Sequence, residues 1–270
     1  MIAAMLDLVS NLTALACLLP AALLPLRGEG RRDAAFWGAV ALAVAGPSVI
    51  SGSMLWAHWV TGFAPTLWVL CATTAAVYAL TAVLLRHSWR LLPLVAPYLL
   101  ALGVVATLWQ HAVGRPVGSD TPEGWLTVHV IVGVLAIDFI TLSAIAGLAS
   151  LLQERSLKRK KPGGLARHLP AMAESDRLST VMLVHAELAL AIVVVSGMAL
   201  EWLEYQRLLD HHHKTLLSLL AFVVVGGLLL AKRYTGIRGR AATRLLLLAY
   251  LLLMLAYPGV KFVSEVLLHS

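Results

Sequence analysis

The sequence predicts an all-α, polytopic integral membrane protein with about eight transmembrane helices and both termini outside the cytoplasm. About 60% of its 270 residues are hydrophobic and only 13% are charged, and the mean hydropathy is +0.84. Soluble domains are nearer about half apolar and about a quarter charged. A helix needs about 20 apolar residues to cross a bilayer, so eight helices would occupy most of this chain. We therefore expect a single transmembrane helical domain over residues 1–270.

Apolar runs separated by charged breaks define the expected helices. The eight runs are residues 2–26, 35–56, 65–86, 91–112, 125–152, 179–203, 214–232 and 245–268. The opening segment MIAAMLDLVS has no basic stretch, and its apolar run continues too far for a cleaved signal, so we expect it to remain as the first helix. In most of these helices apolar residues occupy the whole circumference, so the pattern does not identify a single lipid-facing side.

The distribution of basic residues predicts the orientation. The connections after the first, third, fifth and seventh runs hold three, two, seven and five Lys and Arg, so seventeen of the 21 fall on one side of an eight-span arrangement. Cytoplasmic loops carry such an excess. The longest connection, residues 153–178, is then a basic cytoplasmic loop. This distribution also accounts for the net charge of +7 without a nucleic-acid partner.

Sequence motifs for catalysis or covalent cofactor attachment are absent. The two cysteines, Cys17 and Cys71, lie inside apolar runs, which excludes a disulfide framework and a CxxCH haem-attachment site. The sequence has no GxSxG and no HExxH motif. We therefore expect a protein that is not an enzyme.

Histidines gather at the outer ends of the expected helices. The outer set is His58, His111, His129, His211, His212, His213 and His269, whereas His87, His168 and His185 lie elsewhere. Two histidines from different helices can ligate a haem iron between apolar walls. A zinc or copper site would need nearby carboxylates or thiolates, and acidic residues on the same side keep it open. Histidines at an interface can also simply hydrogen-bond to water and headgroups.

Ionisable and aromatic residues within the spans allow structural and functional interpretations. Asp138 and Glu187 lie at bilayer depth, where carboxyl groups are costly and usually mark a site or an internal pair. A contact between Asp138 and His185 on adjacent helices is one candidate pair, and a proton relay is the alternative. Five tryptophans lie near the outer interface and fit an aromatic belt or the wall of a porphyrin slot. They are Trp56, Trp59, Trp109, Trp125 and Trp202.

Two stretches resemble the cytochrome c assembly membrane-protein family, in its small eight-helix branch. The first is GWLTVHVIVGVLAIDFITLSAIAGLASLLQERSLKRK, and the second runs from DHHHKTLLSLLAFVVVGG to the C-terminus. The second contains a His-Lys-Thr start of a helix, a Gly-x-Arg-Gly-Arg-x-Ala loop and a closing Tyr-x-Gly-x-x-Phe-Val. The tryptophan-rich outer loop of the large family members is absent here. Some larger relatives have a histidine in the inner half of the penultimate helix, and Leu230 stands at about that position here.

The resemblance implies haem handling or cytochrome c assembly in the bacterial inner membrane, as a multi-pass protein. It implies a noncovalent b-type haem near the outer face, with His129 and His213 as axial ligands and Lys214 next to a propionate. His269 is the main rival for the second ligand, followed by His212, His58 and His111. The implied partners are haem, the lipid bilayer and proteins of cytochrome c maturation or of respiratory complexes.

Two other functions remain open from the sequence. The first is a b-type haem electron carrier that exchanges electrons with quinol or a membrane partner, because two imidazoles leave no coordination position for substrate. The second is a haem-free structural or regulatory membrane subunit.

Overall fold

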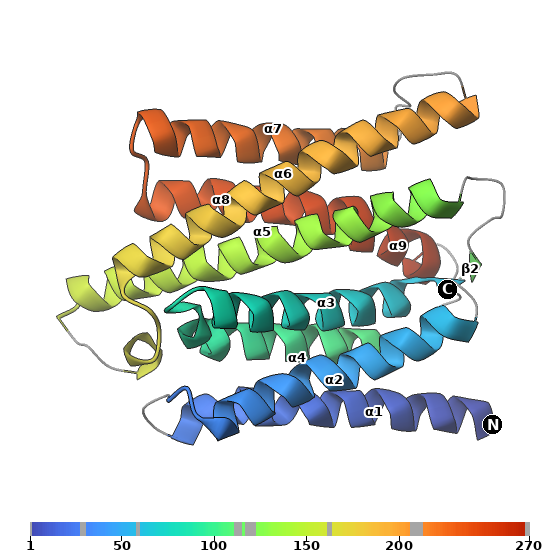
Figure 1. The fold of residues 1–270 in the computed structure, drawn as a ribbon, viewed down its shortest axis with the longest axis horizontal. Coiled ribbons are helices and arrows are strands. Elements are labelled where there is room, and N and C mark those ends of the chain that lie inside the picture. Colours follow the sequence, from blue (N-terminus) through green and yellow to red (C-terminus); the bar gives the residue numbers. More distant parts are fainter. Residues whose placement is uncertain are drawn as a thin grey trace. The chain divides into compact units, whose positions relative to one another are not determined.

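The computed structural model describes residues 2–27, 31–57, 60–110, 115–116, 123–160, 164–205 and 213–267. Nearly all of these residues are helical (Figure 1). The principal helices are α1 (Ile2–Leu23), α2 (Ala34–Ala57), α3 (Phe63–Leu84), α4 (Leu92–Leu108), α5 (Glu123–Lys158), α6 (Met172–Tyr205), α7 (His213–Tyr234) and α8 (Gly239–Met254). The all-α prediction is confirmed.

Short elements connect or extend these helices. The 3₁₀ turns are η1 (Leu24–Arg27), η2 (Ser88–Leu91) and η3 (Gly164–Arg167). Beyond α8 the helix continues as a π-helical turn η4 (Leu255–Gly259), α9 (Val260–Phe262) and a second π turn η5 (Val263–Leu267). A two-residue antiparallel ladder pairs β1 (Val60–Thr61) with β2 (Arg115–Pro116).

The described helices have the length and composition of membrane spans. Seven of them are long and apolar enough to cross a bilayer, and residues 7–23 of α1 form a further, shorter apolar helix. Large apolar side chains such as Val49, Leu188 and Val223 lie on the outside of the described structure. In lipid this exposure carries no cost, since hydrocarbon rather than water surrounds these side chains. The prediction of a polytopic membrane protein is confirmed.

Helices α5 and α6 extend further than hydropathy predicts. α5 continues to Lys158 and α6 begins at Met172, so only residues 159–171 of the expected loop 153–178 lie outside the two helices. The extra turns contain Leu, Glu, Lys and Arg, which are good helix formers in water. The side-chain amide of Gln153 donates to the carbonyl oxygens of Ala166, Leu169 and Pro170, which fixes the loop against the end of α5.

The chain divides into two compact units. The first contains residues 1–117, 152–171 and 261–270, and the second contains residues 118–151 and 172–260. In the first unit, α1 packs on α2 and α4, and α3 packs on α2 and α4. A Cβ atom at Gly46 would lie only 2.5 Å from Cβ of Cys17, so glycine permits the close approach of α2 to α1.

A polar network lies in the core of the first unit. The Trp68 side chain is fully buried, and its indole N–H donates to Oδ1 of Asn11. The Asn11 amide group donates to Oε1 of Gln110 at 2.9 Å. At the other end of the chain, a carboxylate oxygen of Glu265 accepts from the backbone N–H of Phe63 at 2.6 Å. This last bond caps the start of α3, where backbone N–H groups have no partner within the helix.

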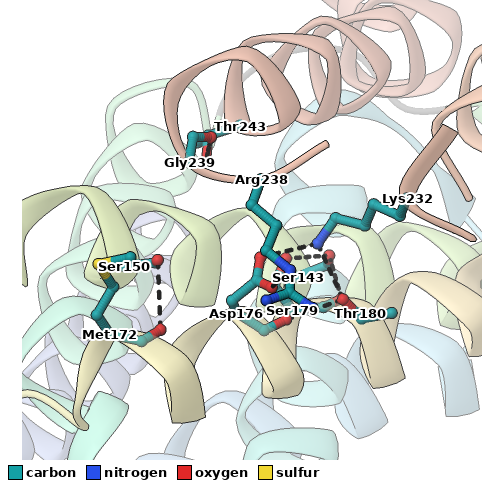
Figure 2. Close-up of polar contacts among 10 residues, drawn as sticks. All are labelled: Ser143, Ser150, Met172, Asp176, Ser179, Thr180, Lys232, Arg238, Gly239 and Thr243. Atoms are coloured by element: carbon teal, nitrogen blue, oxygen red, sulfur yellow. Dashed lines mark hydrogen bonds and ion pairs between the residues drawn. The ribbon is translucent and has the colours of Figure 1, made fainter. Parts of the chain in front are cut away.

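The second unit joins the first part of α5 to α6, α7 and α8. α7 packs against both α6 and α8. The hydroxyl of Ser143 on α5 donates to the backbone oxygen of Ser179 on α6 at 2.7 Å, in a fully buried position (Figure 2). Pro258 lies inside the π turn that follows α8. Because proline has no N–H and its ring obstructs the preceding turn, it favours such a local widening.

Candidate functional site

One side of α5 lines a cavity in the second unit. The cavity has a volume of about 240 Å³, and its α5 wall includes His129, Gly133 and Ile137. These positions recur every four residues and therefore lie on one face of the helix. Leu190 and Val193 on α6, Ser218 on α7, and Leu253, Ala256 and Tyr257 complete the lining. Its volume is close to the lower end of the range of ligand pockets, about 300–1,000 Å³.

A hydrogen bond joins His129 on α5 to Ser196 on α6. Nδ1 of the half-buried ring lies 2.7 Å from Oγ of Ser196. The same hydroxyl lies 3.1 Å from the carbonyl oxygen of Val193. A hydroxyl has one proton, so it donates to only one of these two acceptors at a time. When it donates to Val193, Nδ1–H of His129 donates to Oγ of Ser196, and Nε2 carries the lone pair that a metal requires.

Two further residues shape the surroundings of the His129–Ser196 contact. The indole N–H of Trp125, four residues before His129 on α5, donates to the backbone oxygen of Ser196 at 3.3 Å. A Cβ atom added to Gly197 would lie 3.3 Å from Cε1 of His129, so glycine makes room for the ring on α6. The pair Ser196–Gly197 thus provides an acceptor and a gap for one imidazole.

The other predicted ligands fall at or beyond the edges of the described structure. His213 and Lys214 are the first two residues of α7, where the structure describes the backbone and not the side chains. His269, His211, His212, His58 and His111 lie outside the described residues. The structure therefore places one of the predicted ligands, His129, in a described environment.

His213 and His269, the two main candidates for a second ligand, lie at different sequence distances from the residues that line the cavity. His213 precedes the cavity residue Ser218 by five positions on α7, about 7.5 Å along the axis. His269 follows the cavity residue Tyr257 by twelve positions in the sequence. His129 is six residues into α5, about 9 Å from its start, and not at the helix end as the sequence suggested. In sequence separation, His213 is nearer the cavity lining than His269.

Asp138 and Glu187, the two acidic residues within the expected spans, lie in different surroundings. Asp138 is fully buried, whereas His185 is exposed. The His185 ring packs against Phe139, with 5.4 Å between the ring centroids, and its Nδ1 lies 2.8 Å from the carbonyl oxygen of Val181. These contacts do not support the expected pairing of Asp138 with His185. Glu187 lines a different cavity of the second unit.

The remaining aromatic and histidine predictions can be placed in part. Trp125 and Trp202 are exposed, as an interfacial belt requires. Trp109 packs against Phe63 and Phe262 in the first unit, with centroid distances of 6.3 and 5.7 Å. The side chains of Trp56 and Trp59 are outside the described part. His87 precedes η2, and His168 borders a small hollow beside Trp89 and Arg90, so both lie in the first unit.

Sequence reasoning missed Ser196, Gly197, Ser218 and Tyr257. The sequence does contain a signal for Ser196 and Gly197, because this Ser-Gly pair interrupts a run of bulky apolar residues in α6. Small residues at such positions usually mark close helix contacts in membranes. Among the described residues, no group of three or more His, Cys, Asp or Glu side chains could hold a metal ion. The zinc or copper alternative therefore finds no ligand cluster in the described part of the chain.

Comparison with known proteins agrees with the resemblance found in the sequence. The family described as Cytochrome C assembly protein matches residues 47–268. A protein of Azospirillum brasilense, described as "Uncharacterized 28.8 kDa protein in nifR3-like 5'region", is 45% identical over 267 residues. That alignment covers 97% of this chain and 98% of the relative. No solved structure matches the chain. This multi-pass membrane protein belongs to the cytochrome c assembly protein family, which supports a role in cytochrome c biogenesis.

Proposed function

We propose that this chain binds a b-type haem noncovalently through His129 and serves cytochrome c biogenesis by handling that haem. The observation that carries the proposal is the hydrogen bond between Nδ1 of His129 and Oγ of Ser196, in which we propose the imidazole as the donor. Metal-binding histidines commonly donate their other N–H in this way, which fixes the ring and its tautomer. The ring also borders an apolar cavity between α5, α6, α7 and the extension of α8.

The surrounding residues suit a flat, mainly apolar ligand. Val134, Ile137, Leu190 and Leu253 line the cavity and give it a mainly apolar wall. Haem iron needs two protein ligands at most, whereas a bare zinc ion usually takes three or four. The described surroundings of His129, with one imidazole and no cluster of acidic or thiol groups, fit the first requirement.

We further propose His213 as the second ligand and Lys214 as a cation for a haem propionate. His213 starts α7, the helix that supplies Ser218 to the cavity. Two imidazoles would saturate the iron, so the haem would supply electron transfer or be passed on, without an open position for oxygen chemistry. By the positive-inside rule, the start of α7 and His129 lie toward the outer face of a bacterial inner membrane.

The first test is an absorbance spectrum of the full chain purified from haem-replete cells. We expect a Soret band and sharp, split α and β bands in the reduced form, with haem that organic solvent extracts. His129→Ala should lose most of the haem while still inserting into the membrane. His168→Ala is the control, because His168 belongs to the first unit and is not part of the lining of this cavity. A colourless preparation, or full haem in His129→Ala, would refute the proposal.

The second test separates haem handling from electron transfer. A strain without this protein should contain less mature c-type cytochrome, and the His168→Ala protein should restore it while His129→Ala does not. A normal cytochrome c content, together with reversible reduction of the bound haem by quinol, would instead identify an electron carrier.

A further inference from the structure

A second, larger cavity opens near the start of α6 and the basic C-terminal end of α7. It has a volume of about 680 Å³ and lies entirely in the second unit. Asp176, Thr180 and Glu187 contribute from α6, and Lys232 and Arg233 from the end of α7. Arg238, just before α8, also borders it. We refer to this cavity as the basic pocket.

The rim of the basic pocket has more positive than negative charge. Nζ of Lys232 donates to Oδ1 of Asp176 at 3.0 Å and to Oγ1 of Thr180 at 2.9 Å (Figure 2). Nε of Arg238 lies 3.9 Å from the other carboxylate oxygen of Asp176, and the Arg238 side chain is 78% exposed. Three cations, Lys232, Arg233 and Arg238, line the rim beside one carboxylate, that of Asp176, which contacts Lys232 and Arg238. Most guanidinium donors of Arg238 remain available for an anion.

The wall below the rim is apolar and open to the side. Leu230 is 59% exposed and Val184 is 42% exposed, and both line the pocket. Hydrocarbon chains of the bilayer are the natural contact for such side chains at this depth. A ligand that fits must therefore combine an anionic end with an apolar body.

Glu187 forms the floor of the pocket. Its Oε1 approaches α7 so closely that a Cβ atom at Gly226 would lie 2.7 Å from it. Its Oε2 is buried and has no hydrogen-bond partner among the described residues. Gly226 precedes Lys232 by six residues, so the carboxyl group lies about 9 Å deeper than the rim. When it is protonated, this carboxyl group can donate to an ester carbonyl below the anionic end of a ligand, a partner that bare hydrocarbon cannot offer.

We propose that the basic pocket binds an anionic phospholipid from the leaflet at the basic ends of the helices, with the headgroup phosphate at Lys232 and Arg238. Arginine forks and lysine ammonium groups bind phosphate oxygens through charge-assisted hydrogen bonds. The apolar wall then receives the upper part of an acyl chain. The described lining contains no histidine, cysteine or methionine to ligate iron or a soft metal, which separates this site from the cavity at His129.

The test measures which lipid the full chain retains. The protein is reconstituted into vesicles of equimolar phosphatidylcholine and phosphatidylglycerol, re-extracted with mild detergent, and analysed for bound lipid by mass spectrometry. We expect about one phosphatidylglycerol per chain and little phosphatidylcholine. Arg238→Gln should reduce retention about tenfold, because it removes a charge-assisted contact to phosphate. Arg238 is mostly exposed and makes only the long contact to Asp176, so the variant should fold.

Matched variants distinguish the pocket from the general surface. Leu230→Trp would fill the pocket and should also lower the retention of phosphatidylglycerol. Leu220→Trp is its control and should leave retention unchanged, because Leu220 is on the same helix, has a similar exposure of 48% and does not line the pocket. Arg244→Gln removes an exposed cation of α8 that does not line the pocket and should leave retention unchanged. Unchanged retention in both pocket variants, or an equal loss in the controls, would overturn the proposal.

Two further arms identify the source of the phosphate group. Inorganic phosphate in the detergent buffer should not displace the bound phosphatidylglycerol, because the apolar wall contributes to binding. Displacement by inorganic phosphate would show a free-anion site and overturn the assignment to lipid. Equal retention of phosphatidylcholine and phosphatidylglycerol would show that the rim cations do not select the ligand and would overturn it as well. None of these measurements depends on haem.

Discussion

The imidazole of His129 on α5 and the hydroxyl of Ser196 on α6 are hydrogen-bonded at 2.7 Å. The same hydroxyl lies 3.1 Å from the carbonyl oxygen of Val193, one turn earlier in the same helix. In the proposed haem site the hydroxyl donates to that carbonyl and accepts from Nδ1–H of His129, which leaves the lone pair on Nε2 for the iron. Ser196 would then orient a histidine of the neighbouring helix toward the iron.

Ser196→Ala tests whether this serine orients His129. The substitution removes the acceptor of Nδ1–H, so the ring can rotate or adopt the other tautomer. We expect the affinity for haem to fall by about 10- to 100-fold, as for other residues that orient a metal ligand. Haem titration of the purified chain measures this. Ser179→Ala is the control, since Ser179 is a similarly buried serine on the same helix that bonds Ser143 instead. Equal affinities in the two variants would contradict the role of Ser196.

Gly197→Ala tests the space around the ring. The new methyl group would lie 3.3 Å from Cε1 of His129, so the imidazole must shift. We expect lower haem content and a changed low-spin spectrum. At Gly227 on α7, which does not line the cavity, a new Cβ would meet no atom within 4 Å. Gly227→Ala should keep its haem and gain up to about 1 kcal/mol of helix stability. Equal haem loss in both variants would argue against a specific gap at Gly197.

The identity of the second ligand can be decided by two single variants. His213→Ala should lose most of the low-spin spectrum, because His213 lies five residues from the cavity residue Ser218 on α7. His269→Ala should retain it. Absorbance of the reduced proteins provides the measurement, with membrane insertion checked by immunoblot. The reverse result would move the second ligand to the C-terminus, and loss only in His212→Ala would move it one residue along.

The membrane orientation can be read with reporter fusions. A reporter inserted after Lys160 should be cytoplasmic, and one fused after His269 should lie outside, because most basic residues fall on one side. Lys160 is a suitable position because its φ of 50° marks the left-handed turn that follows the end of α5 at Lys158. Insertion nearer Arg155 would interrupt the helix. The opposite pattern of reporter activity would place the His129 cavity on the cytoplasmic side.

Asn11→Leu tests the polar network of the first unit. The substitution leaves the fully buried indole N–H of Trp68 without its acceptor. We expect a loss of about 1–3 kcal/mol of stability, seen as a lower Tm in detergent. Thr13→Val is the comparison, because the exposed Thr13 hydroxyl bonds only to Val9 of its own helix. That variant should change the stability by no more than about 0.5 kcal/mol, and a Tm loss as large as that of Asn11→Leu would contradict the assignment.

The sequence by itself determined that this is an all-helical, multi-pass membrane protein of this family. It predicted about eight spans, of which seven described helices have the length of a span and residues 7–23 form a shorter apolar helix. Hydropathy predicts these features because the thickness of the bilayer sets the length of an apolar run. It did not predict the ends of α5 and α6, which continue to Lys158 and from Met172. Those turns are polar, and their helical structure depends on local propensity and on contacts such as those of Gln153.

Only the tertiary structure decided which side chains meet. The sequence singled out His129 but not Ser196, and it suggested a contact of Asp138 with His185 that the described contacts do not support. It also did not reveal that Lys232 reaches Asp176 at 3.0 Å across fifty-six positions. Helices that are apolar on all sides carry no signal of their rotation about their own axes. Packing against neighbouring helices sets that rotation, and with it the polar groups that lie within hydrogen-bonding distance.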